Sequence, residues 1–103
     1  VLADVNRLAH ALGLSTGEAF SLFKHFNPGQ TLPARAARIE SADVAAPSFE
    51  LAMARKDLRL MMDEAARGGM DLCVTPAIAA MFDAAIARGE GALDVVVAAR
   101  VAR

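Results

Sequence analysis

The sequence contains neither tryptophan nor tyrosine, and it has one cysteine in 103 residues. A single cysteine, Cys73, excludes an internal disulfide; this fits a reducing compartment, and we expect a cytoplasmic protein. Cys73 lies between Leu72 and Val74, so the pattern predicts a small buried apolar residue rather than a nucleophile. Without the larger aromatic residues, five phenylalanines and five methionines must supply the bulky packing.

A strong charge of either sign is also missing. Eleven Lys and Arg residues stand against 12 Asp and Glu residues, for a formal net charge of -1, and no basic run indicates a nucleic-acid partner. No apolar run is long enough to cross a bilayer. His10 and His25 are far apart, and neither H-x-x-x-H nor C-x-x-C spacing occurs, so no metal site is predicted. No serine lies in a nucleophile-elbow motif, and the lone G-x-G at 89–91 is interpreted as a helix stop.

The chain lacks a recognisable start. It begins with Val1 rather than methionine, and no basic segment precedes an apolar one, as a signal peptide would require. Val1 already belongs to an apolar helical face, and nothing ahead of it caps that helix. We therefore expect a fragment of a longer protein.

What is present is a helical pattern over most of the chain. Apolar residues make up 55% and charged residues 22%, which suffices for a core and argues against disorder. Apolar residues recur at helical spacing between capping and breaking signals. The predicted helices cover roughly residues 1–12, 15–26, 31–41, 49–67, 75–87 and 92–103. The chain is thus predicted to be all-α, a single domain over residues 1–103 with about six helices, three of them short.

Local signals set the expected helix boundaries. Ser15 and Glu18 form an S-x-x-E capping box at the start of the second helix, and Asn27-Pro28-Gly29 should end it. Thr75 is the expected cap of the fifth helix, with Pro76 in the first helical position.

The last segment, "ALDVVVAARVAR", is ambiguous. Three consecutive valines, Val95 to Val97, favour a strand by propensity, whereas the spacing of Leu93, Val96, Val97 and Val101 favours a helix. Since no second convincing strand is available as a partner, we predict a helix here, with Asp94 as its cap.

The longest helix contains "MARKDLRLMMDEAARGG", Met53 to Gly69. At about 100° per residue, its core stripe consists of Leu51, Ala54, Leu58, Met61 and Ala65. Lys56 projects almost opposite to that stripe, between Met53 and Leu60. In one interpretation Lys56 is a surface charge whose stem packs over these two residues. In the other, this face borders a cleft, and Lys56 donates to an anionic or polar ligand there.

Three stretches together resemble the C-terminal domain of the β-hydroxyacid dehydrogenase family, which includes 3-hydroxyisobutyrate dehydrogenase and tartronate semialdehyde reductase. They are "FELAMARKDLRLMMDEAARGG", which carries the K-D-L of Lys56-Asp57-Leu58, "AAMFDAAIARGEGALD" after the Pro76 helix start, and "NPGQTLPARAARI". The resemblance covers essentially the whole chain. It implies a helical domain of the 6-phosphogluconate dehydrogenase-like type.

The resemblance also implies a function. Family members join this domain to an N-terminal Rossmann domain that binds NAD or NADP, and they oxidise a short hydroxy acid by hydride transfer. Their catalytic lysine lies in a motif upstream of Val1, so no catalytic residue is expected in this chain. Lys56 matches the cofactor-contacting lysine at the domain cleft, and Phe49 and Asp57 match positions that line the same region. Val96 replaces a serine that is frequent in the family, which argues against a polar role for that turn.

Two functions therefore compete. In the first, the chain forms the cleft wall and the dimer interface of an NAD(P)-dependent dehydrogenase that acts on a small hydroxy acid, assembles as a homodimer or higher oligomer, and is inactive without its Rossmann domain. In the second, it is a non-catalytic helical module for dimerisation or docking, since an exposed apolar face often binds a partner.

Overall fold

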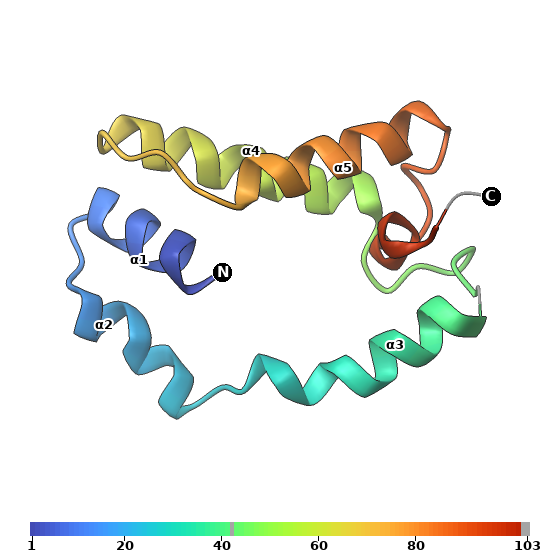
Figure 1. The fold of residues 1–103 in the computed structure, drawn as a ribbon, viewed down its shortest axis with the longest axis horizontal. Helices are drawn as coiled ribbons and strands as arrows, with labels where there is room; N and C mark the ends of the chain where they lie inside the picture. Colours follow the sequence, from blue (N-terminus) through green and yellow to red (C-terminus); the bar gives the residue numbers. More distant parts are fainter. Residues whose placement is uncertain (42, 102–103) are drawn as a thin grey trace. The chain divides into compact units, whose positions relative to one another are not determined.

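The computed structural model describes residues 1–41 and 43–101, and in these residues the regular secondary structure is helical (Figure 1). The α-helices are α1 (Leu2–Ala11), α2 (Thr16–Phe20), α3 (Leu32–Ser41), α4 (Leu51–Arg67) and α5 (Thr75–Ala87). Three short 3-10 helices complete the fold, namely η1 (Ser21–Lys24), η2 (Pro28–Thr31) and η3 (Val95–Ala99). The prediction of an all-α fold is confirmed. No helix of the described residues combines the length and the apolar character that a membrane span requires.

The chain divides into two compact units, which we describe separately. Unit 1 comprises Val1–Asn27 and Asp57–Ala79, and unit 2 comprises Pro28–Lys56 and Ala80–Arg103. Both α4 and α5 contribute one end to each unit.

The helix boundaries largely follow the local signals. Ser15 and Glu18 form the expected capping box, with reciprocal hydrogen bonds of 3.1 Å between side chain and backbone. The second helix is shorter than predicted, because the chain tightens into η1 at Ser21. α4 begins two residues later than expected and ends at Arg67, where Gly69 adopts a φ of +76° that a glycine tolerates without strain.

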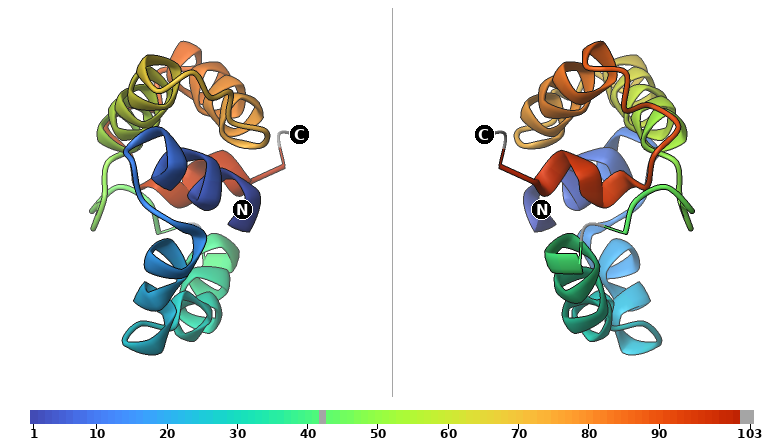
Figure 2. Two further views of the ribbon diagram at one scale, coloured as in Figure 1. Left: turned by 90° about the vertical axis from the view of Figure 1, so that its left-hand side faces the viewer. Right: turned by 90° about the vertical axis from the view of Figure 1, so that its right-hand side faces the viewer.

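The end of the chain settles the ambiguity of the three valines. They form neither a strand nor a full α-helix but the start of the five-residue η3, which contacts α3 (Figure 2). Asp94 is the cap of η3, as predicted, and its carboxylate accepts the N–H of Val96 at 3.0 Å. A single antiparallel bridge, between Glu50 and Asp94, is the only β-type pairing in the described residues.

The core of unit 2 forms where η3 and the first turn of α4 meet α5. Its fully buried members include Leu51 and Val97. The cluster consists of Val44, Leu51, Ala85, Val96, Val97 and Ala98, with Ile39, Phe82, Ile86, Leu93 and Val95 packed against it. Burial of these apolar side chains is the main stabilising contribution in unit 2.

Unit 1 is organised by a buried carboxylate that the sequence did not reveal. Asp4 of α1 accepts the backbone N–H groups of Cys73, Val74 and Thr75 at 2.6, 2.9 and 2.7 Å, and the Thr75 hydroxyl at 2.7 Å. The amides of Cys73 and Val74 directly precede α5 and that of Thr75 is its first, so none of them has a partner within the helix. Asp4, and not Thr75, therefore accepts from the first amides of α5, which begins at Thr75 itself.

Three predictions of burial are wrong. Cys73 is exposed, because Leu72 occupies the buried position in the connection between α4 and α5. Helical spacing assigns Met61 to the inner face of α4 and also predicts Met81 on the inner face of α5, together with Ile78, Phe82 and Ala85, but the two methionines are 41% and 44% exposed. Helical spacing identifies the side of each helix on which the two methionines lie. It does not say whether another segment of the same unit covers that side, and both methionines are left largely uncovered.

Candidate functional site

Lys56 lies in the second turn of α4 and is exposed. The other three cations of this helix are paired: Arg55 with Asp83, Arg59 with Asp63, and Arg67 with Glu64. Among the described residues, no carboxylate lies within ion-pair distance of Lys56. Its ammonium is thus the one positive charge on α4 that remains available to an anionic ligand.

The surroundings of Lys56 on the helix match the mixed face that the spacing predicts. Met53 and Leu60, three residues before it and four after it, are both exposed. Arg55 instead turns toward α5 and binds Asp83 through two hydrogen bonds of 2.7 and 3.2 Å. This bidentate pair fixes the rotation of α4 against α5, and Lys56, one residue on, is left exposed.

Phe49 lies two residues ahead of the first residue of α4. Phe49 is 39% exposed, whereas its backbone N–H and its carbonyl both form hydrogen bonds. The Phe49 N–H donates to the Asp94 carboxylate at 3.3 Å, and its carbonyl accepts the N–H of Val95 at 2.8 Å. Asp57 is half-buried and follows Lys56 in the helix. Phe49 thus lies just before α4, and Lys56 and Asp57 lie in its second turn, so the three predicted residues are close along the chain.

The Asp94 carboxylate binds the residues that precede α4. Its side chain is 0% exposed, and its carboxylate accepts the N–H of Ser48 at 3.0 Å and the Ser48 hydroxyl at 3.2 Å, in addition to the N–H groups of Phe49 and Val96. Arg38 of α3 completes the site, with its guanidinium 3.1 Å from the carboxylate. The buried charge is therefore fully paired and hydrogen-bonded, as such a charge must be.

Arg38 also holds the loop that leads to α4. Its guanidinium donates to the carbonyl of Asp43 at 3.0 Å, to the Ser48 hydroxyl at 3.0 Å, and to the carbonyl of Ala46. One side chain from α3 thus binds the loop at three points. The turn remains polar although Val96 stands where the family often has a serine. The Asp94 carboxylate and the Val96 backbone N–H are its polar groups.

Both buried carboxylates, Asp4 and Asp94, have a pKa below the usual range of an aspartate. Burial by itself raises the pKa of Asp4, but the hydrogen bonds from Thr75, Cys73 and Val74 outweigh it and hold the pKa well below its usual range. Burial also raises the pKa of Asp94, but the hydrogen bonds from Val96, Phe49 and Ser48 outweigh it and hold the pKa below its usual range. Both carboxylates are therefore ionised in the folded protein at neutral pH.

Acidification should therefore unfold the protein through these two groups. A carboxylate whose pKa is lower in the folded state binds fewer protons folded than unfolded, so its stabilising contribution is complete above about pH 4 and declines as the pH falls further. Urea unfolding monitored by circular dichroism should give a midpoint that is constant from pH 7 to 5 and drops below pH 4. A midpoint that stays constant to pH 2.5 would contradict this account.

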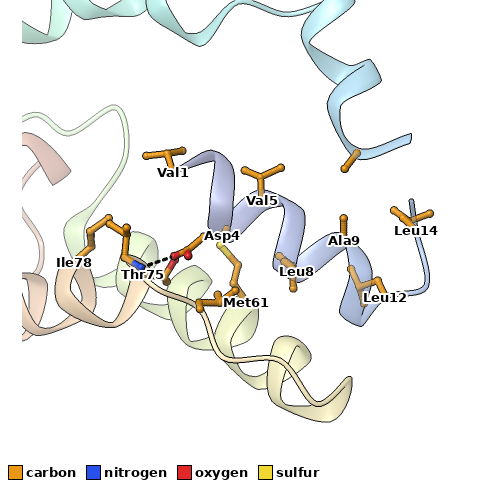
Figure 3. Close-up of a pocket in the computed structure, with 13 residues that line it drawn as sticks. Val1, Asp4, Val5, Leu8, Ala9, Leu12, Leu14, Met61, Thr75 and Ile78 are labelled. Atoms are coloured by element: carbon orange, nitrogen blue, oxygen red, sulfur yellow. Dashed lines mark hydrogen bonds between the residues drawn. The ribbon is translucent and has the colours of Figure 1, made fainter. Parts of the chain in front are cut away.

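Unit 1 carries an apolar groove of about 410 Å³ (Figure 3). One wall is the apolar face of α1 that the sequence predicts, and Figure 3 shows Val5 and Leu8 on that helix, with Asp4 turned toward Thr75. The complete lining consists of Val1, Asp4, Val5, Leu8, Ala9, Leu12, Leu14, Ala19, Met61, Leu72, Val74, Thr75 and Ile78. Its one carboxylate is occupied by four donors, so the groove offers an apolar surface without a free polar anchor.

Sequence reasoning missed three residues that build these sites. For Asp4 a signal was present: at helical spacing it falls beside Val1 and Leu8 on the apolar face of α1, where an acid needs buried partners. Arg38 and Ser48 gave no such signal. Their role depends on a loop that brings them to Asp94, more than 40 residues further along the chain.

Comparison with known proteins identifies the family. The family model described as NAD-binding of NADP-dependent 3-hydroxyisobutyrate dehydrogenase matches residues 3–102. This match confirms the resemblance to 3-hydroxyisobutyrate dehydrogenases and the expected cofactor class, NAD or NADP. No curated protein matches the chain.

A solved structure has the same fold. It is a reductive aminase from Aspergillus terreus in complex with NADPH4, cyclohexanone and allyl amine. The superposition has a TM-score of 0.81 at 19% sequence identity and covers 95% of this chain but 35% of that one. The chain therefore spans about a third of the length of that enzyme, and the likeness at this identity establishes the fold.

Proposed function

The chain belongs to the NAD-binding family of NADP-dependent 3-hydroxyisobutyrate dehydrogenase, and from this we propose that it is the helical C-terminal domain of such a dehydrogenase. In this proposal a Rossmann domain precedes it in the full-length enzyme and binds most of the NAD or NADP. The helical domain supplies the opposite wall of the cleft, where a short hydroxy acid is oxidised. The single observation that carries the proposal is an unpaired cation, Lys56, on the helix start that the family resemblance assigns to the cleft.

The wall has residues suited to a nicotinamide dinucleotide. A bound NAD or NADP would supply the hydride acceptor for oxidation of the carbon that bears the substrate hydroxyl. Lys56 contributes a point charge that can donate to a ribose hydroxyl, a phosphate or a substrate carboxylate. Phe49 contributes an exposed ring with a fixed backbone, and Asp57 adjoins the pair. No group of this domain is assigned to proton transfer, which we attribute to the lysine expected in the upstream segment.

Replacing Lys56 tests this proposal in the full-length enzyme. Lys56→Ala should raise KM for the cofactor or the hydroxy acid about tenfold or more, because a hydrogen bond from a charged group contributes about 1.5–3 kcal/mol. Folding should survive, since Lys56 is exposed and has no ion-pair partner among the described residues. Lys56→Met retains the apolar stem and should show the same loss if the charge is what acts.

Lys24→Ala is the matched control, because Lys24 is the only other lysine of the chain and is also exposed. It should leave KM and kcat unchanged. Unchanged kinetics in Lys56→Ala would remove Lys56 from the site. The isolated chain should show no hydride transfer with any hydroxy acid.

The groove of unit 1 favours an additional role in association. We propose that a second copy of the chain covers it in a homodimer, since an open apolar surface of this kind is typical of an interface. A module that only dimerises or docks is the alternative function, and both proposals hold together if dimerisation is this domain's contribution to the enzyme. A glycine-rich βαβ unit followed by a lysine-bearing helix ahead of Val1 would select the enzyme.

Two methionines give a matched test of the groove. Met61 lines it and Met81 does not, yet both lie on helices with nearly equal exposure. In sedimentation experiments on the chain, Met61→Glu should weaken self-association at least about tenfold, because the carboxylate would be buried without a partner. Met81→Glu should associate like the wild type. A wild-type chain that stays monomeric at high concentration would contradict the dimer.

A further inference from the structure

The loop of residues 43–50 joins α3 to α4, and its course is determined by polar contacts more than by apolar burial. Only Val44 is a buried apolar residue there, while Ala45, Ser48 and Phe49 are exposed. Two buried or half-buried charges, Asp94 and Arg38, bind this loop. Several of their contacts with it converge on Ser48 and Phe49, near the end of the loop and shortly before α4 begins at Leu51.

The start of α4 is tied to the segment that carries Asp94. The N–H groups of Leu51 and Ala52, the first two residues of α4, donate to the carbonyls of Leu93 and Gly91, both at 2.9 Å. In the other direction the N–H of Asp94 donates to the carbonyl of Val44 at 2.9 Å. Amides at a helix start normally bind a capping side chain or water. Here they bind a backbone segment that the Asp94 carboxylate holds in place.

A buried ion pair contributes little to stability compared with apolar residues of similar volume. The Asp94–Arg38 pair therefore requires a reason beyond holding the core of unit 2. The side-chain hydrogen bonds of the pair to the loop, apart from those to the carbonyls of Asp43 and Ala46, go to Ser48 and Phe49. The pair thus determines where Phe49 lies and where the α4 turns that carry Lys56 begin.

We propose that Asp94, paired with Arg38, is a positioning residue that sets the placement of Phe49 and Lys56 against the cofactor. This inference rests on the proposed function, in which these two residues form part of the cleft wall. Asp94 does not touch the cofactor in this account. It acts through the loop and through the first two turns of α4.

The test measures KM and kcat of the full-length enzyme with NADP(H) or NAD(H). Asp94→Asn keeps the shape of the side chain but removes its charge and one acceptor. It should raise KM for the cofactor about fivefold and change kcat less than about twofold, because a misplaced wall loses binding that ground state and transition state share. A purely structural role would lower the amount of folded enzyme, and hence apparent kcat, without changing KM.

A double-mutant cycle with Lys56→Ala makes the test specific. If Asp94 acts through the placement of Lys56, the effect of Asp94→Asn on KM should shrink to less than about twofold in the Lys56→Ala background. Arg88→Gln is the control, since it breaks an ion pair with Glu90 in the same unit, and in the described residues neither of these side chains forms a hydrogen bond or ion pair with the loop. It should leave both constants unchanged.

Ser48→Ala keeps the test decisive if Asp94→Asn does not fold, because it removes a hydroxyl and leaves the backbone contacts. It should raise KM about two- to threefold in the same direction. The inference is overturned if Lys56→Ala raises KM while Asp94→Asn and Ser48→Ala do not, or if the effects of Asp94→Asn and Lys56→Ala multiply independently. If Lys56→Ala itself leaves KM unchanged, the proposed function fails, and this inference fails with it.

Discussion

Replacing Gly68 with alanine is expected to destabilise the protein by about 3 kcal/mol, the upper end of the usual range for overpacking. A Cβ atom at this position would lie 2.5 Å from the Cα and Cβ of Ala11 and closer still to the Ala11 carbonyl oxygen. The end of α1 and the residue that follows α4 approach each other through their backbones here. Backbone atoms cannot rotate away as a flexible side chain can, so one of the two segments must move.

Gly69→Ala is the matched control for this prediction. Its added Cβ would meet nothing within 4 Å, but its φ of +76° is unfavourable for alanine. We expect a cost of about 1 kcal/mol from this strain alone. Thermal unfolding of both variants should therefore show a drop of roughly 15 °C for Gly68→Ala and about 5 °C for Gly69→Ala. Equal drops would mean that the approach of Ala11 to Gly68 does not exist in solution.

Replacing Asp4 with alanine is expected to cost about 3–5 kcal/mol. The carboxylate accepts four hydrogen bonds, three of them from backbone N–H groups at the start of α5. Each donor left without a partner in a buried position costs about 1–3 kcal/mol, although water entering the site reduces the sum. The Thr75 N–H and hydroxyl are the most deeply buried of the four and should account for most of the loss.

Asp71→Ala provides the comparison for Asp4. It removes an acid that is exposed and belongs to the same unit. Its effect on stability should be within about 0.5 kcal/mol. Denaturant unfolding of both variants at pH 7 measures the difference. If Asp4→Ala and Asp71→Ala are equally stable, the contacts between α1 and the start of α5 are not formed as described.

The sequence predicted the helices well where a local rule decides them. The S-x-x-E pattern of Ser15 and Glu18, the end of α4 before Gly68-Gly69 and the capping role of Asp94 each depend on residues within one or two turns. The apolar stripe of α4 was also correct at Leu51, Ala54 and Ala65, which are buried. Periodicity identifies such a face because helical rotation is the same in every sequence.

The sequence predicted the long-range features of the fold less well. Periodicity assigns Met61 and Leu8 to an inner face but does not say whether another element covers it, and in unit 1 that face lines an open groove. The three valines at 95–97 followed neither propensity nor helical spacing, since Asp94 and burial against α3 confine them to a short 3-10 turn. The role of Arg38 depends on a loop conformation that no local pattern encodes.

In the candidate site, too, the sequence predicted the local feature but not the long-range contacts. Spacing alone placed Lys56 opposite the core stripe and favoured an ordinary surface charge. The structure adds that its three cationic neighbours on α4 are paired and that the start of the helix is anchored by a buried network. These observations favour a ligand for Lys56, and the family supplies the class of ligand.

The most direct measurement is the structure of the full-length enzyme with bound NADP(H) or NAD(H). We predict that the Lys56 Nζ lies within hydrogen-bonding distance, about 2.7–3.2 Å, of an oxygen of the cofactor or of a bound hydroxy acid. Phe49 should border the same site. A complex in which Lys56 faces solvent, with the cofactor contacting other parts of this domain or none, would contradict the account.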